Sequence, residues 1–129
     1  METALKLTDP LLCTVFQRAN LNADDLNIIE MNQVVWFARA AFTNSEQTFV
    51  QHAHGLLDED DFKQFEASMR VSVSTPALRI AWPRVRPIFA GKFVEYVDRM
   101  FVETPIRVLS AGALAGWKAE MTAELAKVA

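Results

Sequence analysis

Four side chains near the middle of the chain have the chemistry to bind a small anionic or aromatic molecule: Glu46, Arg79, Trp82 and Arg86. A guanidinium binds an anionic group through paired hydrogen bonds, and an indole stacks on rings and cations. We predict that Glu46 pairs with Arg79, or with Arg70 or Arg86, and orients it toward a ligand. Both features have a structural alternative: the Glu46–arginine pair can be a structural clamp, and Trp82 can lie in the core while the arginines reach solvent.

Two other groups of polar residues suggest a metal site, but their spacing does not support one. His52 and His54 are two residues apart, so on a helix they point in directions roughly 200° apart. Residues 58–61 (Asp-Glu-Asp-Asp) lack the alternating ligands, central Gly and distal Glu of a calcium loop. These carboxylates fit the first turn of a helix. We therefore predict no metal ion and no cofactor.

The sequence also contains no recognisable catalytic set. It has no Gly-rich phosphate loop, no Ser/His/Asp or Cys/His arrangement, and only two His and one Cys. Cys13 lies in an apolar run, so we expect it to be buried, and as a lone cysteine it cannot form an intrachain disulfide. We name no catalytic residue and expect a reducing, cytoplasmic environment.

Composition indicates one globular domain without a membrane span. The 129 residues are 51% apolar and include nine Phe and three Trp, which is enough for a hydrophobic core. The first ten residues lack the apolar centre of a secretory signal, and no run of 18 apolar residues is free of charge.

Charge is distributed unevenly along the chain. Residues 1–69 carry four basic and eleven acidic side chains, whereas residues 70–107 carry seven basic and three acidic ones. Faces of opposite sign can meet inside the fold or across a dimer, and a basic segment can also bind nucleic acid. The net charge of −3 and the absence of lysine-rich runs argue against nucleic acid.

The elements that must position these residues are helices, and one of them dominates. Residues 24–54 contain neither Pro nor Gly, so they can form one helix about 46 Å long. Gly55 suits the left-handed residue that follows many helices. A mostly apolar row of side chains recurs along this segment at alternating spacings of three and four residues. This pattern predicts a seam against which neighbouring helices pack. The seam consists of Ile28, Met31, Val35, Ala38, Phe42, Ser45, Phe49, His52 and Leu56.

Shorter helices are expected around the long one. A first helix over residues 9–18 has Pro10 at its opening position, where the missing N–H does no harm. Asp58 would cap a helix that returns antiparallel to the long one, and Thr75 would cap a short helix beginning at Pro76. Two more helices are predicted over residues 90–102 and 114–128. The last of these carries an apolar row that includes Trp117.

Several short motifs between residues 9 and 100 carry a family resemblance. They are Asp9-Pro10; Phe42 with Glu46 and Phe49; Gly55-Leu56-Leu57-Asp58-Glu59; Pro76, Arg79 and Trp82; and Phe93 with Val97-Asp98. In this order they resemble a family of bacterial all-helical proteins to which no activity is attached. The resemblance covers roughly 70% of the chain. It implies a helical fold, often found after a membrane anchor, whereas this sequence shows no anchor and continues past Thr104.

Together these observations predict an all-α, single-domain antiparallel bundle of five to six helices with one long central helix. The domain spans residues 1–129, with 1–8 as a flexible N-terminus and 104–129 as a helical extension. The predicted core consists of Phe16, Val35, Phe42, Phe49, Phe62, Phe65, Met69, Trp82, Phe93 and Val97.

Our leading functional hypothesis is a non-enzymatic protein-interaction or sensory module. Five or six short helices cannot hide all the apolar surface of such a chain, so we expect a homodimer. Its contacts would be the seam of the long helix and the tail with Trp117. The alternatives are a small-ligand domain, with a pocket between the second half of the long helix and residues 79–82, and a nucleic-acid-binding protein that uses residues 70–107.

Overall fold

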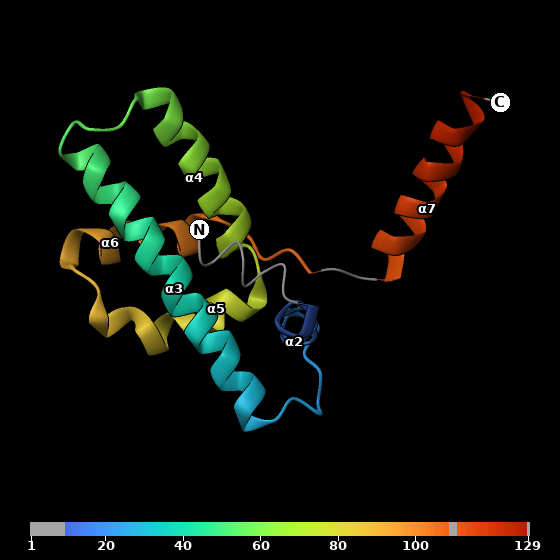
Figure 1. Cartoon of the computed structure of the whole chain (residues 1–129), viewed down its shortest axis with the longest axis horizontal. Helices are drawn as coiled ribbons and strands as arrows, with labels where there is room; N and C mark the ends of the chain where they lie inside the picture. Colours follow the sequence, from blue (N-terminus) through green and yellow to red (C-terminus); the bar gives the residue numbers. More distant parts are fainter. Residues whose placement is uncertain (1–9, 109–110, 129) are drawn as a thin grey trace.

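The computed structural model describes residues 10–108 and 111–128, and all regular structure in this part of the chain is helical (Figure 1). The predicted all-α single domain with a long central helix is confirmed. That helix, α3, has 26 residues and is about 39 Å long. The predicted flexible N-terminus lies outside the described residues. The elements are α2 (Pro10–Asn20), α3 (Ile28–Ala53), α4 (Glu59–Val73), α5 (Pro76–Val85), the 3-10 turn η1 (Arg86–Ile88), α6 (Gly91–Glu103) and α7 (Ala111–Ala126).

The long helix begins four residues later than the sequence pattern predicts. Asn27 is its N-cap: the Asn27 side chain accepts a hydrogen bond from the Glu30 N–H, and Glu30 accepts one from the Asn27 N–H. This reciprocal capping box gives side-chain acceptors to two backbone N–H groups at the start of the helix, which have no partner within it. Asp24 and Asp25 instead lie in the connection between α2 and α3.

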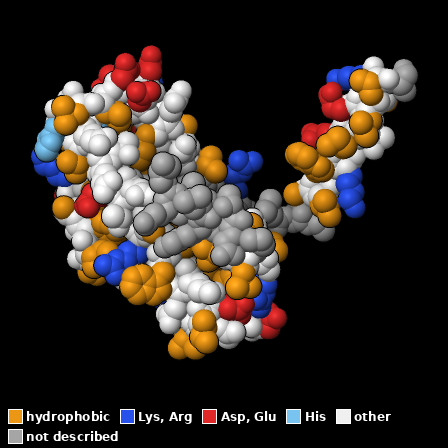
Figure 2. All heavy atoms as spheres, in the orientation of Figure 1, with side chains coloured by type: hydrophobic (Ala, Val, Ile, Leu, Met, Phe, Trp, Pro, Cys, Tyr) orange, Lys and Arg blue, Asp and Glu red, His pale blue; other side chains and the backbone are white. Residues whose placement is uncertain are grey.

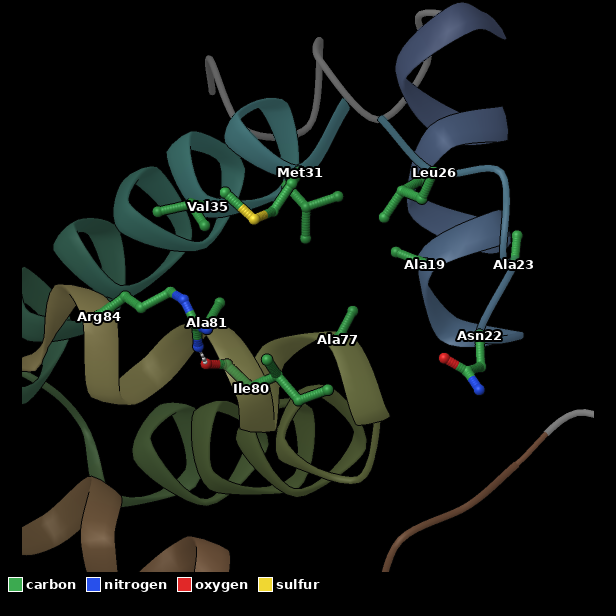
Figure 3. A pocket seen from close by; sticks show the side chains of 11 residues that line it. Ala19, Asn22, Ala23, Leu26, Met31, Val35, Ala77, Ile80, Ala81 and Arg84 are labelled. Carbon is green, nitrogen blue, oxygen red and sulfur yellow. Dashed lines mark hydrogen bonds between the residues drawn. The ribbon is translucent and has the colours of Figure 1, made fainter. Parts of the chain in front are cut away.

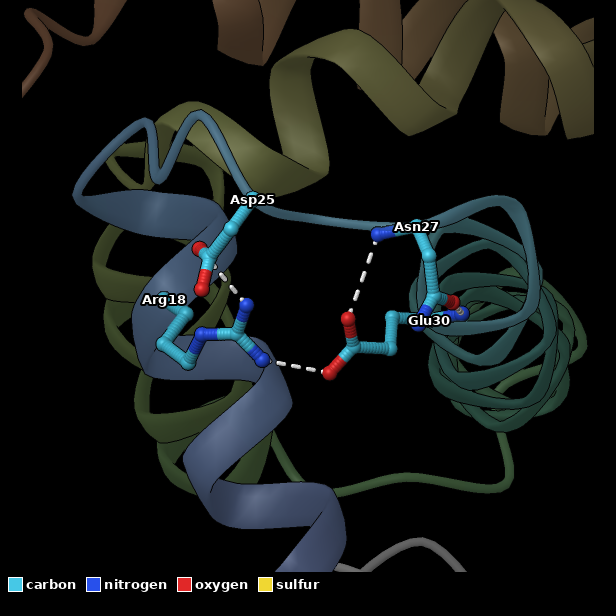
Figure 4. A network of polar contacts seen from close by, with 4 residues as sticks. All are labelled: Arg18, Asp25, Asn27 and Glu30. Carbon is cyan, nitrogen blue, oxygen red and sulfur yellow. Dashed lines mark hydrogen bonds and ion pairs between the residues drawn. The ribbon is translucent and has the colours of Figure 1, made fainter.

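A small polar network holds α2 against the start of α3 (Figure 4). Arg18 of α2 donates to Asp25 at 2.8 Å and also to Glu30. The hydrogen bond from Arg18 lowers the pKa of Asp25 and raises that of the guanidinium. Asp25 therefore holds the α2–α3 connection against α2, whereas Glu30 joins α2 to α3.

The hairpin between α3 and α4 follows the prediction (Figure 1). Gly55 has a φ of +71°, in the left-handed region that L residues rarely adopt. Asp58 caps α4 by accepting a hydrogen bond from the Asp60 N–H at 2.7 Å. Glu59, Asp60 and Asp61 occupy the first turn, where the helix dipole favours carboxylates.

The start of α5 depends on a residue from a distant helix. Pro76 opens α5 as predicted, but Thr75 makes no side-chain cap, because its hydroxyl donates to the Ser72 carbonyl. Asn20, at the end of α2, accepts the hydrogen bond from the Ala77 N–H at 2.9 Å. The helix continues past Pro83 to Val85. Helices α2 and α5 are thus joined by a polar contact as well as by packing.

The core lies where α3, α4, α5 and α6 meet. The ten predicted core residues are confirmed: six are buried, and Phe16, Val35, Phe49 and Phe65 are partly buried against them. Trp82 is central, with its ring 4.7 Å from Phe42. The prediction for Cys13 is wrong, because α2 turns Val15 inward and leaves Cys13 exposed.

The last helix, α7, stands apart from the bundle (Figure 1). It begins at Ala111, three residues before the predicted start, and residues 112–128 are all exposed. A hydrogen bond from the Arg107 N–H to the Ser74 carbonyl holds the preceding segment beside the junction of α4 and α5. The predicted helical extension therefore exists, and its apolar row faces solvent.

Candidate functional site

The four predicted ligand-binding residues all contact α6 or its flanks. The Glu46 carboxylate accepts a hydrogen bond from the N–H of Ala90, the N-cap of α6, at 3.1 Å. At the other end Arg79 donates to the carbonyls of Phe101 (3.0 Å) and Thr104, and its guanidinium lies over the Phe101 ring. An anion at the beginning of a helix and a cation at its end both complement the dipole.

Trp82 and Arg86 meet in the middle of α6, at Asp98. The buried indole N–H donates to Asp98 Oδ1 at 2.7 Å, and Arg86 Nη2 donates to Oδ2 at 2.7 Å. The hydrogen bond from Arg86, supported by the one from the indole, lowers the pKa of Asp98. Asp98 stays anionic at neutral pH and satisfies a buried donor and a cation at once.

These contacts place Trp82 with Arg86 but separate Glu46 from Arg79. Within residues 10–108 and 111–128, no ion pair joins Glu46 to an arginine. Asp98 is the important residue that sequence reasoning did not single out, although it appears in the Val97-Asp98 motif. Each of the four side chains has a partner inside the protein, and Trp82 lies in the core as the structural alternative predicts, but Glu46 binds a backbone N–H and not an arginine. A ligand-binding role for them stays a prediction.

A cavity of about 160 Å³ lies elsewhere, between α2, the first half of α3 and α5 (Figure 3). Its walls are mostly apolar and include several small side chains. Arg84 lies at its edge, where Nη1 donates to the Ile80 carbonyl at 2.7 Å. The lining residues are Ala19, Asn22, Ala23, Leu26, Met31, Val34, Val35, Ala77, Ile80, Ala81 and Arg84.

A second hollow of about 230 Å³ adjoins this cavity, because Val35 and Arg84 line both. We call the two together the α3–α5 groove. Trp36 is 62% exposed at the second hollow, with the Arg39 guanidinium 5.2 Å from its ring centre. The second hollow is lined by Val35, Trp36, Arg39, Arg84, Val85 and Ile88. The groove is therefore apolar inside and carries two arginines.

A further exposed apolar surface is a row along α7 (Figure 2). Trp117, 61% exposed, and Met121 surround a shallow hollow together with Glu120 and Glu124. Residues at these spacings share one side of a helix. We call this side the α7 stripe; its apolar members are Leu114, Trp117, Met121 and Leu125, and it continues to Val128 in the turn after the helix.

The described residues offer little for metal or membrane chemistry. No group of three or more His, Cys, Asp or Glu among them could hold a metal ion. His52 lies 2.8 Å from Glu59 and stacks on Phe62. None of the described helices is long and apolar enough to cross a membrane.

Comparison with known proteins gives no assignment: no family model, no curated protein and no solved structure matches the chain. The protein can therefore be classified only by its fold, which is an all-α bundle with a C-terminal helix that stands apart from it. The bacterial family resemblance in residues 9–100 stays a prediction.

Proposed function

We propose that this chain is a non-enzymatic protein-interaction module that forms a homodimer. The observation that carries the proposal is the α7 stripe, an apolar helix face whose described residues are all exposed. With 16 residues, α7 is only slightly longer than the about 12–15 residues below which isolated helices are marginal in water, and most helices in proteins are stabilised by packing. We therefore expect α7 to pack against another surface. A cytoplasmic location and a bacterial source belong to the same proposal.

The first half of α3, and not the middle of its predicted seam, is available for a dimer contact. Ala38 and Phe42, in the middle of the predicted seam, are buried within the chain. Ile28, Ile29 and Trp36, in the first half of α3, are exposed instead. Among the exposed apolar surfaces of the described residues, we place the dimer contact on the α7 stripe and the α3–α5 groove, because these two are hollowed as well as apolar.

The free energies of burial and association favour an interface that uses more than one stripe. Burial of one large apolar side chain contributes about 1.5–3 kcal/mol, so five of them give on the order of 10 kcal/mol. Association loses about 4–15 kcal/mol of translational and rotational freedom. A single stripe would therefore bind weakly, whereas two stripes in one symmetric dimer would double the gain and incur this loss once.

Sedimentation velocity of the full chain tests the proposal. We expect a monomer–dimer equilibrium across protein concentrations of about 1–100 µM. Joint substitution of Trp117→Ala and Met121→Ala should shift the equilibrium to monomer, because it removes two large members of the stripe. Ala123→Ser, on the opposite side of α7, is the matched control and should dimerise normally. A wild-type chain that stays monomeric throughout this range would overturn the proposal.

A second candidate is a small-ligand domain, and the cavity is the observation in its favour. Its volume of about 160 Å³ is close to that of an engineered apolar cavity, about 150 Å³, that binds benzene. Arg84 at its edge could bind a carboxylate. The position differs from the predicted one, because rings from Phe42, Phe89 and Phe101 pack around Trp82.

Benzoate is a suitable probe for this second candidate. In two-dimensional NMR, titration should shift the amide signals of Ala77 and Ala81, and Arg84→Gln should weaken the binding. Toluene serves as the control for apolar filling without the carboxylate. Unchanged spectra with both compounds would remove the ligand hypothesis. The nucleic-acid alternative stays a prediction; Arg79 and Arg86 of its basic segment are held by internal contacts.

A further inference from the structure

We propose that each α7 of the homodimer lies in the α3–α5 groove of the other copy. Trp117 would enter the apolar part of the groove. Glu120 and Glu124 would lie beside the groove arginines, Arg39 and Arg84. The inference rests on the proposed function, because it requires the chain to associate with itself, and it adds which surface contacts which.

The two surfaces extend over similar lengths of chain. From Leu114 to Leu125 the α7 stripe is about 16 Å long, and the groove follows α5 and η1 from Ala77 to Ile88, the same number of residues. Ala77 and Ala81 line the groove with small side chains and so leave space above α5. A large side chain such as Trp117 can therefore enter it, as a knob enters a hole between facing helices.

The two surfaces also match in charge. Within the described ranges, neither Arg39 nor Arg84 forms an ion pair: Arg39 lies over the Trp36 ring, and Arg84 donates to a backbone carbonyl of its own helix. On α7, Glu124 pairs with Lys127 at an exposed position. Opposite charges beside complementary apolar surfaces select one binding mode and one orientation.

A second copy of the chain accounts for both surfaces together. An unrelated helical partner could cover the groove, or an unrelated groove could cover α7, but each would leave the other surface exposed. Figure 1 shows α7 directed away from the bundle, where it can reach another molecule. Reciprocal exchange gives a closed two-fold dimer in which both grooves and both stripes are covered.

Charge reversal with complementation tests this arrangement. In one variant the groove is changed by Arg84→Glu; in the other the helix is changed by Glu120→Arg with Glu124→Arg. Each variant alone should dimerise at least about tenfold more weakly than wild type, because like charges meet twice in the dimer. An equimolar mixture should restore dimerisation, because the variant groove receives the variant helix and the unchanged groove receives the unchanged helix.

Two controls separate charge matching from general effects of charge. Ala123→Arg adds a cation to the opposite side of α7, and Arg99→Glu reverses an exposed charge on α6. Both should dimerise as the wild type does. Circular dichroism of every variant should show wild-type helix content, because all the changed residues are exposed.

The outcomes distinguish this inference from the proposed function. If the wild type is monomeric, the proposed function itself fails. If the wild type dimerises but the reversals have no effect, or the mixture restores nothing, the exchange of α7 is overturned while the dimer stands. A third outcome is that dimerisation returns in a chain that carries both the groove and the helix reversals but not in the mixture of the two variants. In that case α7 occupies the groove of its own chain, and exchange between copies is likewise overturned.

Discussion

Two regions of this molecule combine a tryptophan with an arginine and reach opposite results. Trp82 is 4% exposed, its N–H is bound by Asp98, and Arg86 binds the same carboxylate. Trp36 is 62% exposed, and Arg39 lies over its ring. The residue types are the same, but among the described residues a carboxylate from a neighbouring helix binds the first pair and none binds the second.

The difference shows what separates a part of the fold from an available surface. An indole can be buried when an acceptor reaches its N–H, because an unsatisfied donor in the core is costly. Asp98 provides that acceptor around Trp82. At the α3–α5 groove no element within the described part of the chain covers Trp36, so its apolar surface remains available. The Trp82 region therefore contributes to the stability of the fold, whereas the groove is the surface that we propose for association.

The largest expected effect is a loss of stability at Phe42, which we compare with the same substitution at Trp36. Phe42 is 2% exposed and packs on Trp82, so Phe42→Ala should lower the free energy of unfolding by about 3–5 kcal/mol. Trp36→Ala should change it by less than about 0.5 kcal/mol, because the ring already contacts water. Urea unfolding below the dimerisation range measures both. Equal losses would break the distinction between the two regions.

The fold was largely predictable because local signals govern it. Pro10, Gly55 and Asp58 each act through their own or adjacent backbone, and each is found where the sequence places it. The start of α3 was misplaced by a competing signal of the same kind. Asn27 and Glu30 cap the helix with two reciprocal hydrogen bonds, so the helix begins after Asn27 and not at Asp24.

The candidate site was less predictable because its contacts join distant parts of the chain. Glu46 binds the backbone of Ala90, which is 44 positions away. Neither the periodicity of α3 nor residue type reveals that an acidic side chain will reach a backbone N–H instead of an arginine. The groove depends in turn on the placement of α2 by Asn20 and Arg18, which sequence spacing does not show.

A smaller effect is expected at Asp98, where two substitutions separate its roles. Asp98→Ala leaves the buried indole N–H of Trp82 without an acceptor and should cost about 1–3 kcal/mol. Asp98→Asn keeps an acceptor but removes the charge. Its cost should stay below about 1 kcal/mol, because the Asp98 side chain is 40% exposed and the pair with Arg86 is screened by solvent.

The same pair predicts how stability depends on pH. The pKa of Asp98 is lowered in the folded state, so the unfolded chain binds the proton more readily. This contribution is present above the usual aspartate pKa of about 3.9 and is lost as pH falls through the lower, folded value. Asp98→Asn should therefore differ from wild type at pH 7 and converge with it in acid. A difference that stays constant from neutral to acidic pH would contradict the ion pair.

The smallest effect is expected from deletion of residues 109–129, which removes α7. Because residues 112–128 are exposed, the deletion should change the unfolding free energy of the monomer by less than about 0.5 kcal/mol. At higher concentration the two chains should diverge: the melting temperature of the full chain should rise with concentration through coupled dimerisation, and that of the shortened chain should stay constant. Differential scanning calorimetry over a concentration series measures both. A large loss at low concentration would mean that α7 stabilises its own bundle, and the groove and the stripe would then belong to one molecule instead of two.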